Sequence, residues 1–152
     1  MVSCVLGGTF NILHKGHEAL LRRALLFDKI FIGITSDAFV KKHKIYPAVP
    51  FGKRKESVEK WFSRKNKIIK IFRISDIFGN TLKKDYDYMI VSEETFPNAE
   101  KINSMRKKRG KKPIAIVVIP IVRAYDGKKL SAWRIHKGEI DRNGKKLSKG
   151  NI

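Results

Sequence analysis

The sequence predicts an α/β fold in which a parallel sheet of five strands carries helices on both faces. Five apolar segments of strand length alternate with helical or loop segments along the chain, a pattern typical of parallel sheets. The first apolar segment ends at two adjacent glycines, Gly7 and Gly8, which suit a tight turn after a buried strand. No internal repeat or break in composition divides the 152 residues, so we expect one domain with a single core.

The first half of the chain supplies three of the expected strands. Val2 to Leu6 and Ile30 to Ile34 are short apolar runs typical of buried strands, and Ile68 to Ile74 alternates as a third. Apolar residues recur at helical spacing after Gly16, and a Thr-Ser-Asp sequence marks a second helix start. The expected helices in this half are residues 16–28, 37–42 and 51–62.

The second half continues the alternation. We expect strands at residues 88–91 and 113–119, separated by a helix over 97–109 that Gly110 closes. A short last helix is expected to begin at Ser131. Residues 1–144 would form the domain, and residues 145–152 a basic, flexible tail. In a Rossmann-like sheet of this kind, ligands bind outside the carboxyl ends of the strands.

Composition limits the classes of function. The chain has 34 Lys and Arg against 14 Asp and Glu, a formal charge of +20 that favours anionic partners such as nucleotides or nucleic acid. The one cysteine, Cys4, excludes a disulfide framework and a cysteine-based zinc site. We find no apolar run near the ~20 residues that cross a bilayer, and no signal peptide. We therefore expect a cytoplasmic protein.

The loop after the first expected strand holds the most informative motif. It reads GGTFNILHKGH, from Gly7 to His17. Adjacent glycines expose backbone N–H groups, and a helix that begins near Gly16 directs its positive end into the same space. His14 and His17 lie three residues apart at that helix start, so both imidazoles would face one side. Such a group of donors suits a phosphate that gains negative charge during a reaction.

Two histidines in a loop can also be incidental or can bind zinc. Zinc is disfavoured because no third or fourth Cys or His ligand lies nearby in the sequence. The segment as a whole resembles the "GTFDxxHxGH" signature of the HxGH nucleotidyltransferase superfamily, with its residues in the right order between a strand and a helix. The resemblance implies a nucleotidyltransferase fold.

Later segments narrow the resemblance to one group of the superfamily. VSEETFPNA from Val91 to Ala99, with Arg106 following, is similar to the archaeal-type phosphopantetheine adenylyltransferase pattern "VSxETxxxAxxINxxR". LSAWRI and KGEID, between Leu130 and Asp141, match the place of "ISSTRIRxGEID". The resemblance covers Val2 to Gly144 and implies transfer of AMP from ATP to 4′-phosphopantetheine, giving dephospho-CoA and pyrophosphate in coenzyme A synthesis.

The resemblance also implies roles for individual residues. Implied as catalytic are His14, His17 and Lys42. Implied to bind ATP are Gly8, Thr9, Phe10, His17, Glu94, Thr95, Arg106, Ser131 and Arg134. Implied to bind the acceptor are Thr9, Asn11, Lys41 and Lys42. Magnesium would come with the triphosphate, without a dedicated metal site in the protein.

Several of these residues have a simpler interpretation. Lys41 and Lys42 can be solvated residues of a basic surface, and Arg106 stands in a basic run typical of a surface. Ser131 can serve only to cap the last helix, and Arg134 can pair with a carboxylate. Which of the two lysines acts stays open.

Two departures from the family pattern affect the expected site. Asn11 replaces the usual Asp, which keeps the size and acceptor oxygen but removes the charge. Ala132 and Trp133 replace two hydroxyl residues beside the expected pyrophosphate site. Either Trp133 points into the core and Arg134 suffices, or the geometry of the triphosphate has changed.

Two other functions remain open. One is the same transfer to flavin mononucleotide, nicotinamide mononucleotide or an alcohol phosphate. The other is a non-catalytic, basic nucleic-acid-binding protein on the same fold, although we expect nucleic acid to bind only non-specifically through the basic surface. The sequence leaves the oligomeric state open and slightly favours a monomer.

Overall fold

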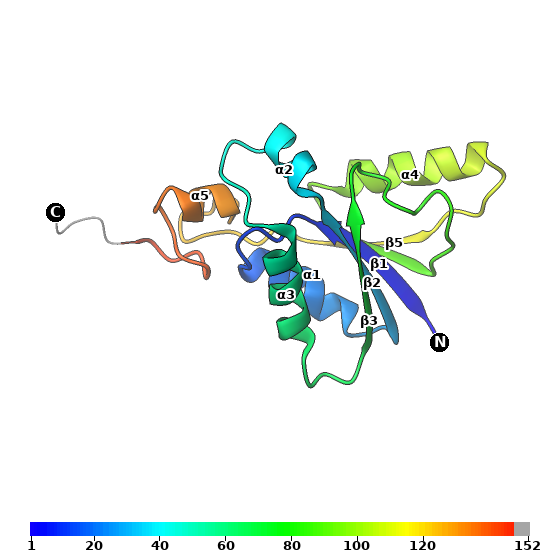
Figure 1. The fold of residues 1–152 in the computed structure, drawn as a ribbon, viewed down its shortest axis with the longest axis horizontal. Coiled ribbons are helices and arrows are strands. Elements are labelled where there is room, and N and C mark those ends of the chain that lie inside the picture. Colours follow the sequence, from blue (N-terminus) through cyan, green and yellow to red (C-terminus); the bar gives the residue numbers. More distant parts are fainter. Residues whose placement is uncertain (148–152) are drawn as a thin grey trace.

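The structure is a computed structural model that describes residues 1–147, and it has the expected alternation of strands and helices (Figure 1). The five strands are β1 (Ser3–Gly8), β2 (Lys29–Thr35), β3 (Ile68–Ile74), β4 (Tyr88–Ser92) and β5 (Ala115–Ile119). The helices are α1 (Lys15–Ala24), α2 (Asp37–His43), α3 (Phe51–Phe62), α4 (Phe96–Lys108) and α5 (Ala132–His136).

All strands are parallel and follow the order β3-β2-β1-β4-β5, which confirms the predicted sheet. The chain builds outward from β1 through β2 to β3, then returns to place β4 on the other side of β1. The strand order therefore reverses between β1 and β4. In open parallel sheets such a reversal opens a crevice at the carboxyl ends of the strands, where ligands bind.

Helices cover both faces of this sheet. Figure 1 shows α1 and α3 together on one face and α4 on the opposite face, with α5 at the end where the strands finish. The larger core cluster joins β1 and β2 to α1 and α3 through residues such as Leu21, Ile32 and Phe62. A second cluster packs Ala99 and Ile102 of α4 against β1 and β4. Each face of the sheet is therefore covered by its own layer of helices.

Most predicted elements agree with the structure to within one or two residues, and α1 is the main exception. The helix ends at Ala24 rather than Asp28, because Leu26 and Phe27 donate short turn hydrogen bonds to Arg23 and Ala24. Phe27 nevertheless stays in the core, which explains why its spacing looked helical. Gly110 closes α4 at φ +72°, as expected for a residue in the left-handed region.

The chain beyond α5 remains hydrogen-bonded to the domain up to Leu147. Asp141 donates its backbone N–H to Lys145, and Leu147 donates to Glu139. The boundary predicted at Gly144 therefore falls inside a bonded turn, and residues 148–152 of the predicted tail lie outside the described residues. Within residues 1–147, no helix combines the length and the apolar character that a membrane crossing requires.

Candidate active site

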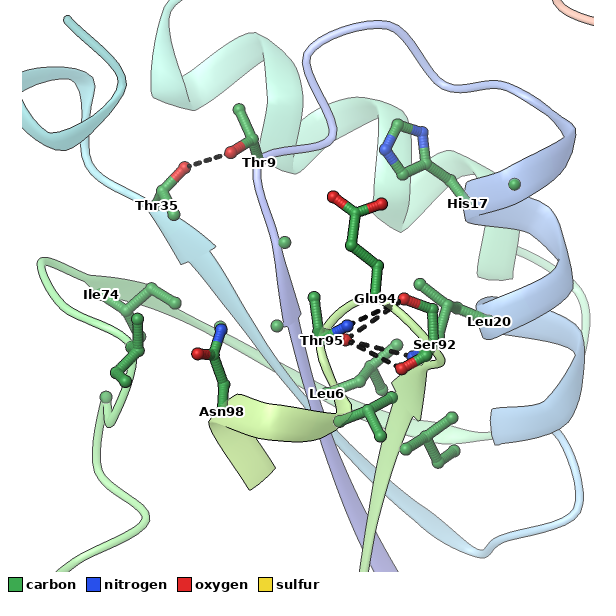
Figure 2. Close-up of a pocket in the computed structure, with 18 of the residues that line it drawn as sticks. Leu6, Thr9, His17, Leu20, Thr35, Ile74, Ser92, Glu94, Thr95 and Asn98 are labelled. Atoms are coloured by element: carbon green, nitrogen blue, oxygen red, sulfur yellow. Dashed lines mark hydrogen bonds between the residues drawn. The ribbon is translucent and has the colours of Figure 1, made fainter. Parts of the chain in front are cut away.

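A cavity of about 730 Å³ lies at the carboxyl ends of β1, β2 and β4, where the strand order reverses. Its walls come from the glycine loop, the start of α1, the segment after α2, the start of α4 and the start of α5. Figure 2 shows His17 and Thr9 on opposite sides of this space, with Glu94 projecting between them. Segments far apart in the sequence thus meet at one place.

The glycine loop shapes one side of the cavity. Gly8 and Thr9 line it, whereas Phe10 turns into the core with only 1% of its surface exposed. Phe10 adopts φ +52°, which is rare for a bulky side chain and forms the tight turn. A Cβ on Gly8 would come within 2.9 Å of the Phe10 ring, so this turn requires glycine there. The side chain of Phe10 therefore holds the turn in place from the core and does not line the cavity.

His14 and His17 form one unit at the start of α1. His14 is the N-cap: its Nδ1 accepts the Gly16 N–H at 3.0 Å, and Nδ1 of His17 accepts the His14 N–H at 3.3 Å. The two rings stack with centroids 3.8 Å apart, and Phe10 packs against His17. Because Nδ1 accepts in both rings, the proton of each neutral imidazole sits on Nε2.

Both imidazoles are neutral near pH 7. Burial, together with the positive charge of Lys129, lowers the pKa of His14 to about 4. Burial also lowers the pKa of His17 to about 3, aided by His14, Lys129 and Lys44, while a backbone hydrogen bond with Ile12 opposes the shift. The pair can therefore donate hydrogen bonds to phosphate oxygens without carrying charge of its own.

Positive charge at the cavity comes from two lysines that the sequence analysis did not select. Lys44, just after α2, and Lys129, just before α5, line the cavity. Lys41 and Lys42 are exposed on α2 and are not among the lining residues. Phe39 and His43, four residues apart on α2, line the cavity, so the intervening Lys41 and Lys42 lie on another side of the helix. The run of lysines indicated the segment but could not resolve the position.

The start of α4 supplies the polar floor. Ser92 and Thr95 bond to one another, with the Ser92 N–H donating to Thr95 Oγ1 at 3.1 Å (Figure 2). Glu94 lines the cavity and pairs with Lys129, so it links the starts of α4 and α5 across the space. Glu94 and Thr95, which the family resemblance implies to bind ATP, therefore both line the cavity.

Ser131 also lines the cavity, but its hydroxyl caps α5 by accepting the Arg134 N–H at 3.3 Å. The Arg134 guanidinium donates to Glu139 and Asp126 and to the Lys129 carbonyl, and it is not among the lining residues. These two carboxylates raise the pKa of Arg134. The simpler interpretations of both residues thus describe what their side chains do in this structure.

Arg106 differs most from both sequence-based interpretations. It is neither at the surface nor at the cavity, since only 1% of it is exposed. Its guanidinium donates to the carbonyls of Thr81, Lys84 and Lys112 and to the Asp85 carboxylate. The implied ATP contact is replaced by a structural clamp, which its place in a basic run gave no means of predicting.

The two departures from the family pattern have distinct structural consequences. Asn11 lines the cavity and ties the glycine loop to the segment after α2: Oδ1 accepts the Val49 N–H at 2.7 Å, and Nδ2 donates to Pro47 at 3.2 Å. An Asp could not donate the second bond. Trp133 lines the cavity rather than entering the core, and its ring lies 6.1 Å from that of Tyr46 at an interplanar angle of 20°.

The described residues do not group into a protein-built metal site. Among residues 1–147, no three His, Cys, Asp or Glu side chains come together as metal ligands. Asp76 and Glu94 are the acidic residues that line the cavity, and Glu94 is paired with Lys129.

The chain is similar to known proteins in sequence and in structure. The cytidylyltransferase-like family matches residues 5–138. The phosphopantetheine adenylyltransferase of Methanosarcina mazei is 39% identical, over 95% of this chain and 97% of the relative. The bifunctional phosphopantetheine adenylyltransferase/NTP phosphatase of Thermoplasma acidophilum is 42% identical over 95% of this chain, which spans only 44% of that relative's length.

Among solved structures, a protein with unknown function from Archaeoglobus fulgidus has a TM-score of 0.72 and 37% identity, over 78% of this chain and 89% of that chain. The family match over residues 5–138 includes the glycine loop, the two histidines and the starts of α4 and α5. This chain therefore belongs to the cytidylyltransferase-like family and, within it, to the archaeal-type phosphopantetheine adenylyltransferases.

Proposed function

We propose that this protein transfers the AMP part of ATP to 4′-phosphopantetheine, releasing pyrophosphate and forming dephospho-CoA. The observation that carries the proposal is the stacked His14–His17 pair at the start of α1, which opens onto the cavity at the strand-order reversal. Two phosphopantetheine adenylyltransferases are 39% and 42% identical to this chain, over 95% and 91% of its length, and this similarity supports the choice of acceptor.

No residue of the protein needs to form a covalent bond in this reaction. An oxygen of the acceptor phosphate attacks the α-phosphorus of ATP, the bond from that phosphorus to the bridging oxygen breaks, and pyrophosphate leaves with that oxygen. A phosphate monoester is already ionised near neutral pH, so no general base is needed. Catalysis then depends on holding two anions together and on stabilising the charge that develops between them.

The cavity supplies both requirements. The Nε2–H groups of His14 and His17 donate to α-phosphate oxygens, and the start of α1 adds its positive end. Lys44, on the segment that Asn11 fastens to the glycine loop, bridges the acceptor phosphate and the α-phosphate in place of Lys41 or Lys42. Lys129 offers charge toward the β- and γ-phosphates, beside the Ser131 hydroxyl.

Magnesium enters with ATP as its counter-ion, held by triphosphate oxygens and water. The protein residues act on the resulting complex through hydrogen bonds and charge. A cytoplasmic location is consistent with a substrate pair of this kind.

The test is an acceptor panel. Purified protein with Mg-ATP should release pyrophosphate fastest with phosphopantetheine, and much more slowly with flavin mononucleotide, nicotinamide mononucleotide or an alcohol phosphate. Equal or faster turnover with another acceptor would contradict the acceptor assignment but not the reaction class. Pyrophosphate release with no member of the panel would contradict the enzymatic function.

A further inference from the structure

Arg54 of α3 lies behind the glycine loop and is 1% exposed, so its charge is withdrawn from water. All three of its guanidinium nitrogens donate hydrogen bonds. Nε donates to the Val49 carbonyl at 2.7 Å, one terminal nitrogen donates to the carbonyls of Thr9 and Thr35 at 3.0 and 2.8 Å, and the other donates to Asp37 at 2.7 Å. A buried arginine is retained only where such bonds are satisfied together.

The partners of Arg54 belong to the segments that carry the expected chemistry. Thr9 lines the cavity from the glycine loop, and its hydroxyl accepts the Thr35 Oγ1 hydrogen at 3.0 Å. Lys44 lies between Asp37, the first residue of α2, and Val49. Arg54 bonds to both of these residues, so it holds the chain before and after Lys44. One side chain therefore sets the distance between the glycine loop and that lysine.

Arg54 also supports the unusual turn at Phe10. The Thr9 carbonyl that it binds belongs to the peptide bond leading into Phe10, whose φ is +52°. Such a conformation persists only where the surrounding structure determines it from several sides. The Phe10 ring then packs against His17 at 5.0 Å between centroids. A chain of contacts thus runs from the guanidinium to the histidine pair.

We propose that Arg54 is a positioning residue for adenylyl transfer: it touches neither substrate, but it fixes Thr9, the Phe10 turn and the Lys44 segment relative to one another. The inference rests on the proposed function. Since displacement of a reacting group by about 1 Å can cost about 10²-fold in rate, loss of Arg54 should lower kcat far more than its effect on folding explains.

Arg106 provides a matched control. It is equally buried, and its guanidinium makes the same set of bonds, to three backbone carbonyls and one carboxylate. Of its partners, Thr81 lines the cavity from the loop after β3, whereas Lys84, Asp85 and Lys112 lie outside the lining, and none of the four belongs to the glycine loop or to the Lys44 segment. Arg54→Lys and Arg106→Lys each keep a positive charge and lose the planar fork that bonds in several directions. Comparable losses of thermal stability are expected for both.

The experiment measures kcat, both KM values and the folded fraction by circular dichroism, well below each melting temperature. Arg54→Lys should lower kcat by about 10²-fold per folded molecule, with the KM for ATP little changed, while Arg106→Lys keeps a near-normal kcat. Equal kcat values for the two folded variants would overturn the positioning role. An inactive wild-type protein would instead overturn the proposed function.

If Arg54→Lys does not fold, two milder substitutions test the same inference at the carboxylate partners of the two arginines. Asp37 and Asp85 are the exposed carboxylate partners of the two arginines, with 56% and 79% of their side chains accessible. Asp37→Asn should lower kcat several-fold, and Asp85→Asn should not. If neither changes kcat, the inference fails.

Discussion

His17 performs two tasks with the two nitrogens of one ring. Nδ1 accepts the His14 N–H and so completes the cap of α1, while Nε2 carries the proton that can reach a phosphate. An alanine substitution would remove both, and the cap alone contributes about 0.5–2 kcal/mol. Separating the two tasks therefore needs side chains that keep only one of them.

His17→Asn keeps a short acceptor for the cap but removes the group at the Nε2 position. We expect kcat to fall by about 10²–10³, as when a donor to a developing oxyanion is lost, with a small change in the KM for ATP. The melting temperature should stay near that of the wild type. His17→Gln, which places an amide near the Nε2 position, should recover part of the turnover.

The comparison separates a catalytic from a structural histidine. If His17 served only α1, the Asn variant would keep its turnover and the Gln variant would lose stability without further loss of rate. Near-normal kcat in His17→Asn would therefore exclude His17 from the transfer step.

The buried histidines also make stability depend on pH. The pKa of His14 is lowered to about 4 by burial and by Lys129, whereas an unfolded histidine titrates near 6.5. Between these values the unfolded chain binds more protons, so the free energy of unfolding decreases as the pH falls from about 6.5 toward about 4. Urea unfolding of wild type and His14→Asn across this range should show a weaker pH dependence in the variant, which retains a cap acceptor. Equal slopes would contradict the lowered pKa.

At the scale of elements, the segment after α2 determines which lysine reaches the cavity. Lys44 lines it, whereas Lys41 and Lys42, three and two residues earlier, do not. Lys44→Ala should lower kcat by about 10²-fold because the charge between the two phosphates is lost. Lys41→Ala and Lys42→Ala are matched controls within the same basic run and should keep their activity. Loss of activity in Lys42→Ala but not in Lys44→Ala would reverse the assignment.

The sequence predicted the elements well where local pattern determines them. Strand runs such as Ile68–Ile74 and the helix Phe51–Phe62 agree with their predicted bounds, because apolar periodicity and helix ends are local properties. The order of the strands, which places the cavity between β1 and β4, depends on pairing over long distances, and the sequence analysis did not predict it.

The sequence predicted the site residues that belong to one motif. It did not predict those whose position depends on tertiary contacts. His14, His17 and Thr9 come from one loop, and all three line the cavity. Arg54 and Arg106 look like other basic residues in the sequence, and only the fold shows that carbonyls converge on each. Lys129 likewise has no local signal, since its place depends on how the chain returns before α5.

For the whole molecule, the +20 charge remains the property that the proposed reaction uses least. Among residues 1–147, Lys44 and Lys129 are the basic side chains of lysine or arginine that line the cavity, and most of the others in this range are exposed on the surface. Under the proposed function, long-range attraction of anionic substrates would account for part of this excess. Nucleic acid would be attracted by the same field.

Titration with duplex DNA and with RNA distinguishes attraction from recognition. We expect non-specific binding with dissociation constants of about 10⁻⁴–10⁻⁶ M at physiological salt, weakening steeply as salt increases. Submicromolar, sequence-selective binding that persists at that salt would make nucleic acid a specific partner of this protein.

The fate of individual phosphates tests the central claim most directly. The protein is incubated with phosphopantetheine and ATP that is radiolabelled at either the α- or the γ-phosphate, and the products are separated. Adenylyl transfer predicts that the α-label appears in dephospho-CoA and the γ-label in pyrophosphate. A γ-label on the acceptor, or an α-label found only in free AMP or ADP, would contradict the account.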